Sequence, residues 1–183
     1  KRLHLNYDRS QGYMVLMRDE RERKLLQASI ELMRAEGIDL KVLSTAEALE
    51  IEPALNTAET KLLEALYFPH DEVGNCREFA YLLKKEAEDL GVEFELNAHV
   101  QNLLPNQADT IRLSQQDKGQ KFDAIVACAG LASATLLKPL GIKIPLMAVH
   151  GYSISAAVRE PLDAPRSGVM DERYKISITR LGQ

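Results

Sequence analysis

One group of residues that could do chemistry lies at the end of an apolar run. The run from Phe122 to Gly130 is nearly continuous in apolar residues and ends in Ala129-Gly130. Such an ending lets a ligand approach the backbone with no large side chain in between. Ser133 stands where it could cap a following helix, whose first amides would favour an anionic group. The spacing alone favours a simpler interpretation, a strand-to-helix turn that needs glycine only for its geometry.

A second group lies in the run from Tyr174 to Arg180, where apolar and polar residues alternate strictly. A period of two places four side chains on one face of a strand: Tyr174, Ile176, Ile178 and Arg180. Arg180 then either extends to solvent at the sheet edge or borders an apolar pocket. In a pocket, its guanidinium could hold a carboxylate through two parallel hydrogen bonds. The sequence leaves both arrangements open.

Two segments that contain a histidine are not expected to take part in catalysis. His150 stands before Gly151-Tyr152 and has no nucleophile or carboxylate nearby in the sequence. We therefore expect it to be structural or exposed. The polar run 70–72 follows Pro69, and we expect it to be a loop before a capped helix rather than an acid–base pair.

Familiar catalytic and metal-binding motifs are missing from this sequence. It has no G-x-G-x-x-G after a strand, no P-loop, no H-E-x-x-H and no G-x-S-x-G, so the usual phosphate cradle is not encoded here. Cys76 and Cys128 lie far apart, with no His or Cys at metal-ligand spacing. We predict no metal site, and we expect both cysteines to be small buried hydrophobes.

Length and composition limit the class of protein. With 183 residues, 45% of them hydrophobic and 27% charged, the chain can form one large domain or two small ones. A net charge of -4 argues against a nucleic-acid partner. There is no signal-peptide pattern and no apolar run near the roughly 20 residues that cross a bilayer, so we expect a cytoplasmic location. The chain starts without Met and stops after a strand-like segment, which predicts a piece of a longer protein.

The elements expected at the start of the chain carry clear local signals. We predict a strand over 12–17 and a helix over 19–36 that ends at Gly37. Ser44 and Glu47 have the spacing of a capping box, and Pro53 keeps the helix that they open short.

The middle of the chain predicts a compact α/β region. Asn75 opens a helix that runs to Leu90, with Gly91 as its stop. We expect a helix from Gly130 to Leu140 and strands over 92–96, 110–114, 121–127, 149–158 and 174–180. Asp117-Lys118-Gly119 predicts a tight turn, and the strand that follows it has the apolar character of a central buried strand. We place domain boundaries near Leu66 and Pro145, so that 66–145 interrupts a domain made of 1–65 and 146–183.

Several segments resemble a known family. The segments Phe68 to Phe79, Gly91 to Phe94 and Phe122 to Gly130 are similar to those of the D-amino acid oxidase superfamily of FAD-dependent flavoproteins. Pro145 to Ser153 and Asp171 to Arg180 look closest to the bacterial D-amino acid dehydrogenase small subunit within it. Glu52-Pro53-Ala54-Leu55 is a further similar junction, and the resemblance spans nearly the whole chain.

The resemblance implies an α/β fold with α+β elements. In it, 66–145 is part of an FAD-binding domain, and 1–65 and 146–183 are parts of a mixed-sheet substrate domain. The implied reaction oxidises a D-amino acid: a hydride passes from the carbon bearing the amino group to flavin N5, and the imine hydrolyses to a keto acid and ammonia. FAD supplies this chemistry in the longer protein, so no acid–base dyad is required. The implied electron acceptor is a quinone or oxygen, and peripheral attachment to the inner membrane stays open.

The resemblance also assigns residues. The backbone of Val100 matches a position on the adenine side of FAD, and Ala129 and Gly130 match a strand end near the cofactor, beside Ser133. Three residues fall in segments that line the substrate side: Tyr152, Tyr174 and Arg180. His150 departs from the Lys or Arg that many relatives carry before the glycine, which puts a charge contact there in doubt.

Three alternatives remain at this level. Related members of the superfamily act on glycine or sarcosine, or on a hydroxy acid such as glycerol-3-phosphate. The third alternative is a small module that binds a ligand or protein without catalysis. Without a phosphate-binding turn, we expect this chain alone to bind FAD weakly or not at all and to show no turnover.

Overall fold

The computed structural model describes residues 3–57, 60–104, 107–114 and 118–182. These residues form two compact units, the first made of Lys1–Gly91 and Ala156–Gln183 and the second of Val92–Ser155. The second unit is therefore inserted in the sequence of the first, and each is described by itself below.

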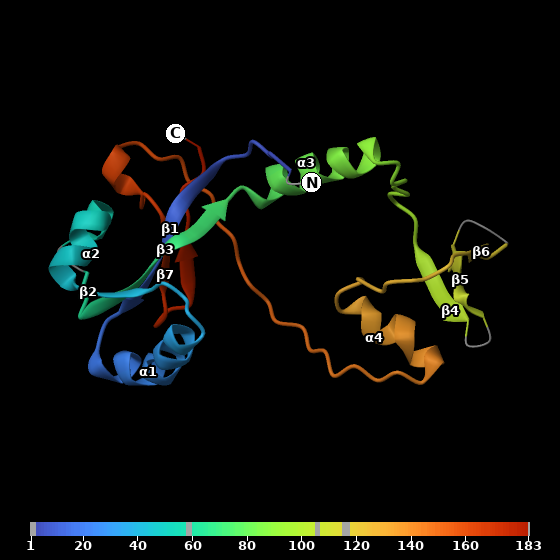
Figure 1. Cartoon of the computed structure of the whole chain (residues 1–183), viewed down its shortest axis with the longest axis horizontal. Coiled ribbons are helices and arrows are strands. Elements are labelled where there is room, and N and C mark those ends of the chain that lie inside the picture. Colours follow the sequence, from blue (N-terminus) through green and yellow to red (C-terminus); the bar gives the residue numbers. More distant parts are fainter. Residues whose placement is uncertain (1–2, 58–59, 105–106, 115–117, 183) are drawn as a thin grey trace. The chain divides into compact units, whose positions relative to one another are not determined.

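The first unit is built on a five-stranded mixed sheet in the order β2-β3-β1-β7-β8 (Figure 1). Its strands are β1 (Arg9–Met17), β2 (Lys41–Ser44), β3 (Glu64–Gly74), β7 (Gly168–Asp171) and β8 (Ile176–Ile178). The central strand β1 pairs antiparallel with β3 and parallel with β7. Two strands from the end of the chain thus complete a sheet that begins at its start.

Helices cover both faces of this sheet. Met14 and Leu16 pack on one face with Ala48 of α2 (Thr45–Ile51). Met17 packs on the other face with Ile30 of α1 (Glu20–Ala35). The alternation of faces along β1 follows from the period of two in a strand, and it makes β1 the centre of two apolar clusters.

The first two helices start where the sequence predicts them. Asp19 accepts the N–H groups of Arg21 and Glu22, each at 3.0 Å, and Ser44 and Glu47 form a reciprocal capping box. The short 3₁₀ helix η1 (Pro53–Leu55) follows α2, as expected for a helix stopped by proline.

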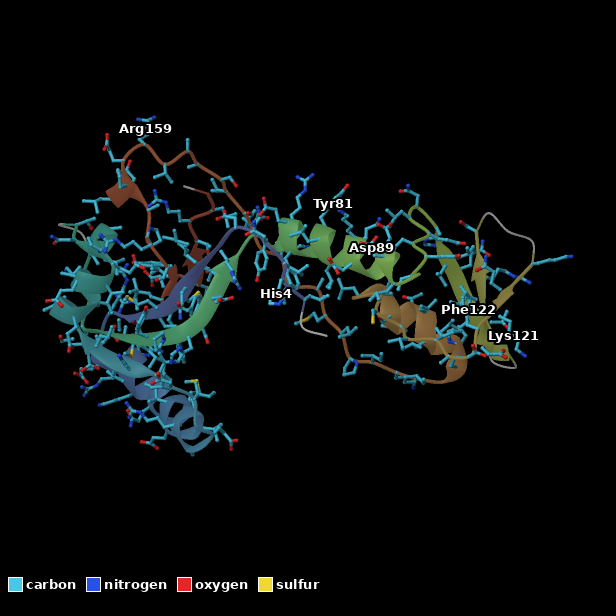
Figure 2. The ribbon with its side chains drawn as sticks, turned by 45° about the horizontal axis from the view of Figure 1, so that its top comes forward. His4, Tyr81, Asp89, Lys121, Phe122 and Arg159 are labelled. Carbon is cyan, nitrogen blue, oxygen red and sulfur yellow. The ribbon has the colours of Figure 1, made fainter. Side chains whose placement is uncertain are left out.

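The long helix α3 (Cys76–Asp89) also begins at its predicted cap, where Asn75 accepts the Glu78 N–H at 3.2 Å. No side chain of α3 is buried among the described residues, and Tyr81 extends from it into solvent (Figure 2). Phe79 packs edge-on against Tyr7, with ring centroids 5.2 Å apart.

The second unit contains a three-stranded antiparallel sheet and a short helix. The strands are β4 (Val100–Leu104), β5 (Gln107–Leu113) and β6 (Gln120–Lys121), in that order. Helix α4 (Ala132–Leu137) continues as the 3₁₀ helix η2 (Lys138–Leu140) and ends at Gly141 with φ +78°. β5 confirms the strand predicted over 110–114, and Gly141 confirms the predicted helix stop. The turn predicted at Asp117 lies partly outside the described residues.

Two predicted strands are wrong, and a third, expected over 121–127, is a strand only at Lys121. Residues 92–96, 122–127 and 149–158 belong to no strand, and Val126, expected in a central buried strand, is 84% exposed. Phe122 stands directly after the short strand β6 (Figure 2) and still donates its N–H to the Asp109 carbonyl at 2.8 Å. A strand needs a neighbour along its whole length for its N–H and C=O groups, and the ladder of this sheet ends there.

The structure differs from the sequence-based expectations at three further places. The polar run 70–72, expected as a loop, belongs to β3, where Glu72 is paired with Gln11 of β1. β7 is a strand that no sequence pattern indicates. Cys76 and Cys128 are free and exposed, so the expectation that both are buried hydrophobes is wrong.

Within the described residues, no helix is long and apolar enough to cross a membrane. The contacts divide the chain after 91 and after 155, and β3 joins residues 66–74 to the sheet of the first unit. The assignment of 66–145 to a flavin domain is a functional one and stays a prediction.

Candidate functional site

The second unit contains an open cavity of about 450 Å³. It lies between β4 with Ile111 of β5, the extended segment 125–129 and one side of α4. Its wall is mainly apolar, with Ile125, Val126 and Leu136 among the lining residues. Pockets for small molecules are typically apolar with a few oriented polar groups.

The turn at the edge of this cavity is held by a hydrogen bond from its own backbone. The Ala129 N–H donates to Oγ of the buried Ser133 at 3.1 Å, and Gly130 has φ +55°. A left-handed backbone of this kind favours glycine. The expectation that Ser133 caps the helix is wrong: Leu131 stands at the cap position without a side-chain bond, and Ser133 lies inside the first turn.

Val100 presents its backbone to the outside of the sheet. The Ser114 N–H donates to the His99 carbonyl at 2.9 Å, and Val100 is paired with Leu113 in the next position along the ladder. Hydrogen-bonded and non-hydrogen-bonded pairs alternate in an antiparallel ladder. Val100 therefore directs its N–H and C=O away from β5, toward the free edge of β4.

This free edge borders the cavity. β4 is the outer strand of its sheet among the described strands, and Val100 lines the cavity together with Ala129. A donor and an acceptor side by side on one backbone can bind the edge of a flat heterocycle that carries the complementary pair. The structure thus brings Val100 and Ala129 to one cavity, with Gly130 and Ser133 in the turn beside it.

The predicted substrate residues are distributed over both units. Tyr152, in the second unit, is 99% exposed, and His150 is also exposed, as expected. Tyr174 and Arg180 lie in the first unit, on either side of β8.

The strand predicted over 174–180 is shorter than expected. It covers Ile176–Ile178 only, because Lys175 has φ +53° and the chain turns between β7 and β8. Tyr174 lies in that turn, 62% exposed, with the Arg18 guanidinium 5.6 Å from its ring centroid. Arg180 donates through Nη1 to the carbonyl of Pro161 at 3.3 Å.

A network of charged side chains fixes the turn between β7 and β8. Arg18 donates through Nε and Nη2 to one oxygen of Asp171, at 2.9 and 2.6 Å. Arg173 donates a hydrogen bond from Nε to the Glu22 carboxylate at 2.7 Å and also forms a salt bridge with Asp19. The hydrogen bond to Glu22 raises the pKa of Arg173 above its ordinary value.

No pattern in the sequence indicates this network. The interleaved charges of 19–24 are typical of a solvated helix face, and their partners stand about 150 positions later. The backbone N–H of Glu22 is the main cause that lowers the pKa of Asp19, and Arg173 adds to it.

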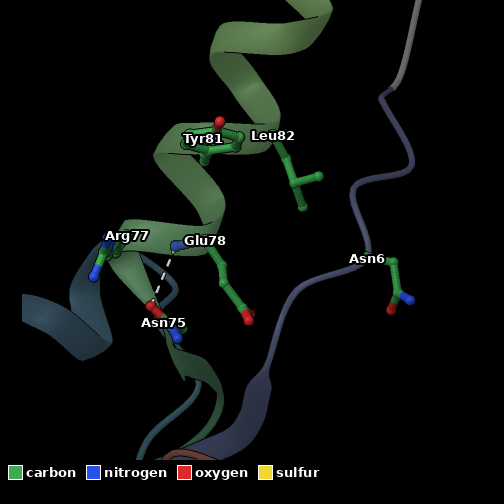
Figure 3. A pocket seen from close by; sticks show the side chains of 6 residues that line it. All are labelled: Asn6, Asn75, Arg77, Glu78, Tyr81 and Leu82. Carbon is green, nitrogen blue, oxygen red and sulfur yellow. Dashed lines mark hydrogen bonds between the residues drawn. The ribbon is translucent and has the colours of Figure 1, made fainter.

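A second cavity, of about 460 Å³, lies in the first unit beside the start of α3 (Figure 3). It is lined by Asn6, Asn75, Arg77, Glu78, Tyr81 and Leu82. Two of its polar groups already serve the fold: Asn75 caps the helix, and the Glu78 carboxylate accepts the Asp8 N–H at 2.9 Å. In the part of the chain that the structure describes, no group of three or more His, Cys, Asp or Glu could hold a metal ion.

Two curated bacterial relatives are similar along nearly the whole chain. The D-amino acid dehydrogenase of Vibrio cholerae serotype O1 is 37% identical over 173 residues, which cover 94% of this chain and 41% of the relative. The D-amino acid dehydrogenase of Allorhizobium ampelinum is 36% identical over 180 residues, which cover 98% of this chain and 43% of the relative. The chain thus spans about two fifths of the length of these relatives.

Solved structures share the fold at lower identity. The L-proline dehydrogenase from P. horikoshii has a TM-score of 0.75 at 18% identity, over 95% of this chain and 47% of that one. The glycine oxidase from Geobacillus kaustophilus has a TM-score of 0.70 at 21% identity, over 89% of this chain and 42% of that one. The family model described as FAD dependent oxidoreductase matches residues 1–183, and the chain belongs to that family.

Proposed function

We propose that this chain is part of a longer FAD-dependent enzyme that oxidatively deaminates D-amino acids. The observation that carries the proposal is the similarity to D-amino acid dehydrogenases over 94–98% of the chain, which includes both units. The products would be a keto acid and ammonia. The electron acceptor would be a quinone or oxygen, and the enzyme would be cytoplasmic or peripheral to the inner membrane.

The cavity of the second unit is suited to the adenine end of FAD. Adenine offers a donor and an acceptor on one edge, which complement the outward C=O and N–H of Val100. The apolar wall at Ile125 and Leu136 suits a flat ring. Ala129 and Gly130 allow close approach of the backbone, and Ser133 fixes their turn.

On the substrate side, Arg180 would hold the substrate carboxylate, with Tyr174 and Tyr152 as further residues that meet the substrate. A guanidinium has five N–H donors, so a two-point hold on a carboxylate is compatible with the hydrogen bond to Pro161. FAD, when bound, supplies the hydride acceptor for the oxidation. The chain's own residues would bind and orient the amino acid.

The proposal assigns 66–145 to the flavin domain and 1–65 with 146–183 to the substrate domain. Glycine, sarcosine and glycerol-3-phosphate are the alternative substrates. The likeness to glycine oxidase, at 21% identity, concerns the fold alone, so D-amino acids are the first choice.

The test uses the full-length protein that contains this chain. It would be assayed with a dye acceptor against matched D- and L-amino acids, glycine, sarcosine and glycerol-3-phosphate, with ammonia release measured in parallel. We expect reduction of the dye and release of ammonia with D-amino acids. Purified protein without flavin, from a gene that encodes no G-x-G-x-x-G upstream of this chain, would favour the non-catalytic binding module instead.

A further inference from the structure

The first unit contains a fully buried carboxylate that the proposed reaction does not use. Glu52, directly after α2, has 0% exposure. Its two oxygens accept the backbone N–H groups of Arg166 and Ser167, each at 2.7 Å, and the Ser167 hydroxyl donates to it as well. The donors stand more than 110 positions further along the chain.

Burial of a carboxylate is unfavourable unless hydrogen bonds replace its water. Among the ion pairs between described residues, none involves Glu52. Two backbone N–H groups and one hydroxyl therefore take the place of water around this buried carboxyl group. An apolar side chain at this position would avoid the cost of burying a carboxyl group. We therefore look for the role of Glu52 in the backbone segment that it holds.

That segment runs from Pro161 to Ser167 and leads into β7. Its first turn, η3 (Pro161–Asp163), lies against η1, which directly follows Glu52. Its end is tightly packed, because a Cβ on Gly168 would meet Cγ1 of Val73 at 2.5 Å. The segment is thus fixed where it enters the sheet.

The other end of the same segment holds Arg180. The Pro161 carbonyl accepts the hydrogen bond from Nη1 of Arg180 at 3.3 Å. Glu52 and Arg180 are therefore linked through a single short stretch of backbone. The Glu52 carboxylate binds one end of this stretch, and its other end accepts a hydrogen bond from the Arg180 guanidinium.

We propose that Glu52 is a positioning residue for Arg180: it fixes the segment 161–167, whose carbonyl at Pro161 orients the guanidinium toward the substrate carboxylate. This proposal rests on the proposed function, in which Arg180 binds that carboxylate. A two-point hold needs the planar fork aligned with the carboxylate, so a looser segment weakens binding of the substrate and leaves the oxidation step itself intact.

The test compares Glu52→Gln, Ser167→Ala and the control Glu50→Gln in the full-length flavoprotein. Glu52→Gln places an amide NH₂ against a backbone N–H, Ser167→Ala removes the hydroxyl donor only, and Glu50 is an exposed carboxylate on α2. We expect Glu52→Gln to raise KM for a D-amino acid about tenfold with kcat within about twofold, the pattern of a lost binding interaction. Ser167→Ala should raise KM by about threefold, and Glu50→Gln should match the wild type.

A second substrate separates positioning from general damage. The amide of the same D-amino acid lacks the carboxylate, so its KM should be the same in Glu52→Gln and in wild type. Flavin content and absorbance should also be unchanged. Hydrogen exchange of the 166 and 167 amides should be about tenfold faster in Glu52→Gln, because both lose a carboxylate acceptor.

The outcomes that oppose the proposal are distinct. If exchange at 166 and 167 accelerates while KM for the D-amino acid stays at the wild-type value, Glu52 is an anchor of the fold only. If KM rises equally for the amino acid and its amide, Arg180 is not the group affected. If Glu52→Gln does not fold, an unchanged KM in Ser167→Ala overturns the proposal. A wild-type flavoprotein that oxidises no amino acid overturns the proposed function itself.

Discussion

Ser133 directs its hydroxyl toward the chain's own backbone. The hydroxyl accepts the Ala129 N–H, so it holds the turn that lines the cavity and leaves ligand contact to the backbone itself. Glu52 acts in the same way on Arg166 and Ser167. At the scale of single residues, these two side chains act by shaping the main chain around them.

Ser133→Ala should loosen this turn. It removes the acceptor of the Ala129 N–H, and a hydrogen bond of this kind contributes about 0.5–1.5 kcal/mol. We expect a lower unfolding temperature and weaker FAD binding in the full-length protein, measured by thermal unfolding and by flavin titration. Ser155→Ala, at an exposed position of the same unit, is the matched control. Equal flavin affinity in the two variants would contradict the proposed role of the turn.

Arg180→Ala should weaken binding of the amino acid. Hydrogen bonds to charged groups contribute about 1.5–3 kcal/mol, which corresponds to a rise in KM of about 10- to 100-fold. Arg180→Lys should recover only part of this, because an ammonium lacks the planar fork. Arg159→Ala, at an exposed arginine of the same unit (Figure 2), should have no effect. The carboxylate assignment fails if KM in Arg180→Ala equals that of the wild type.

At the scale of elements, features that depend on residues close in sequence are predicted well, and features that depend on distant residues are not. The caps at Ser44 and Asn75 and the stop at Gly141 depend on residues three positions apart, so they can be recognised in the sequence. Strand pairing depends on a distant neighbour.

Dependence on a distant neighbour is why no local pattern indicates β7 and why the apolar run after β6 predicts a strand that it does not form. At the candidate site, the family resemblance selects Val100 and the 129–130 turn, and the ladder register explains why the backbone of Val100 is available. The hydrogen bonds of Arg18 to Asp171 and of Glu52 to Ser167 cannot be predicted from the sequence. A pattern of charged residues does not indicate which distant group each side chain will contact.

The sheet of the first unit should depend strongly on Leu66. This β3 residue is 2% exposed and packs with Met17 and Ile30, so Leu66→Ala should reduce the free energy of unfolding by about 2–5 kcal/mol. Leu32→Ala removes an exposed leucine from α1 and should change it by less than about 0.5 kcal/mol. Urea unfolding followed by circular dichroism measures both. Equal midpoints would mean that the cluster around Met17 does not support the fold.

At the scale of the whole molecule, three carboxyl groups link stability to pH. The Glu22 N–H lowers the pKa of Asp19, the Ser44 hydroxyl lowers that of Glu47, and Lys121 lowers that of Asp109. A lowered pKa means that the unfolded chain binds the proton more tightly than the folded one. The stabilisation is therefore complete above the ordinary values of 3.8 and 4.5 and is lost as the pH falls below them.

We expect the unfolding temperature to drop as the pH is lowered from about 5 to about 3, and Asp19→Asn to reduce this drop. Because the main cause at Asp19 is a backbone hydrogen bond, about 1 M salt should leave most of the effect in place. An Asp19→Asn profile that follows the wild type throughout would rule out this linkage.

FAD binding should be a property of the longer protein. The chain spans 41–43% of the curated relatives and contains no G-x-G-x-x-G turn, which is the usual site for the pyrophosphate. We expect this chain, purified alone, to show little flavin absorbance and no turnover. A yellow preparation with a flavin spectrum would show that the cavity at Val100 suffices.

The parallel pairing of β1 with β7 also sets a schedule for biosynthesis. β1, β2 and β3 are all complete once residue 74 has been made, whereas β7 ends at residue 171. At roughly 5–20 residues per second, the β7-side edge of β1 stays open for roughly 5–20 s while residues 75–171, which include the inserted unit, are synthesised. An open edge is a template for another chain, so the nascent protein is most exposed to misassociation during that interval, and crowded polysomes would be where it aggregates first.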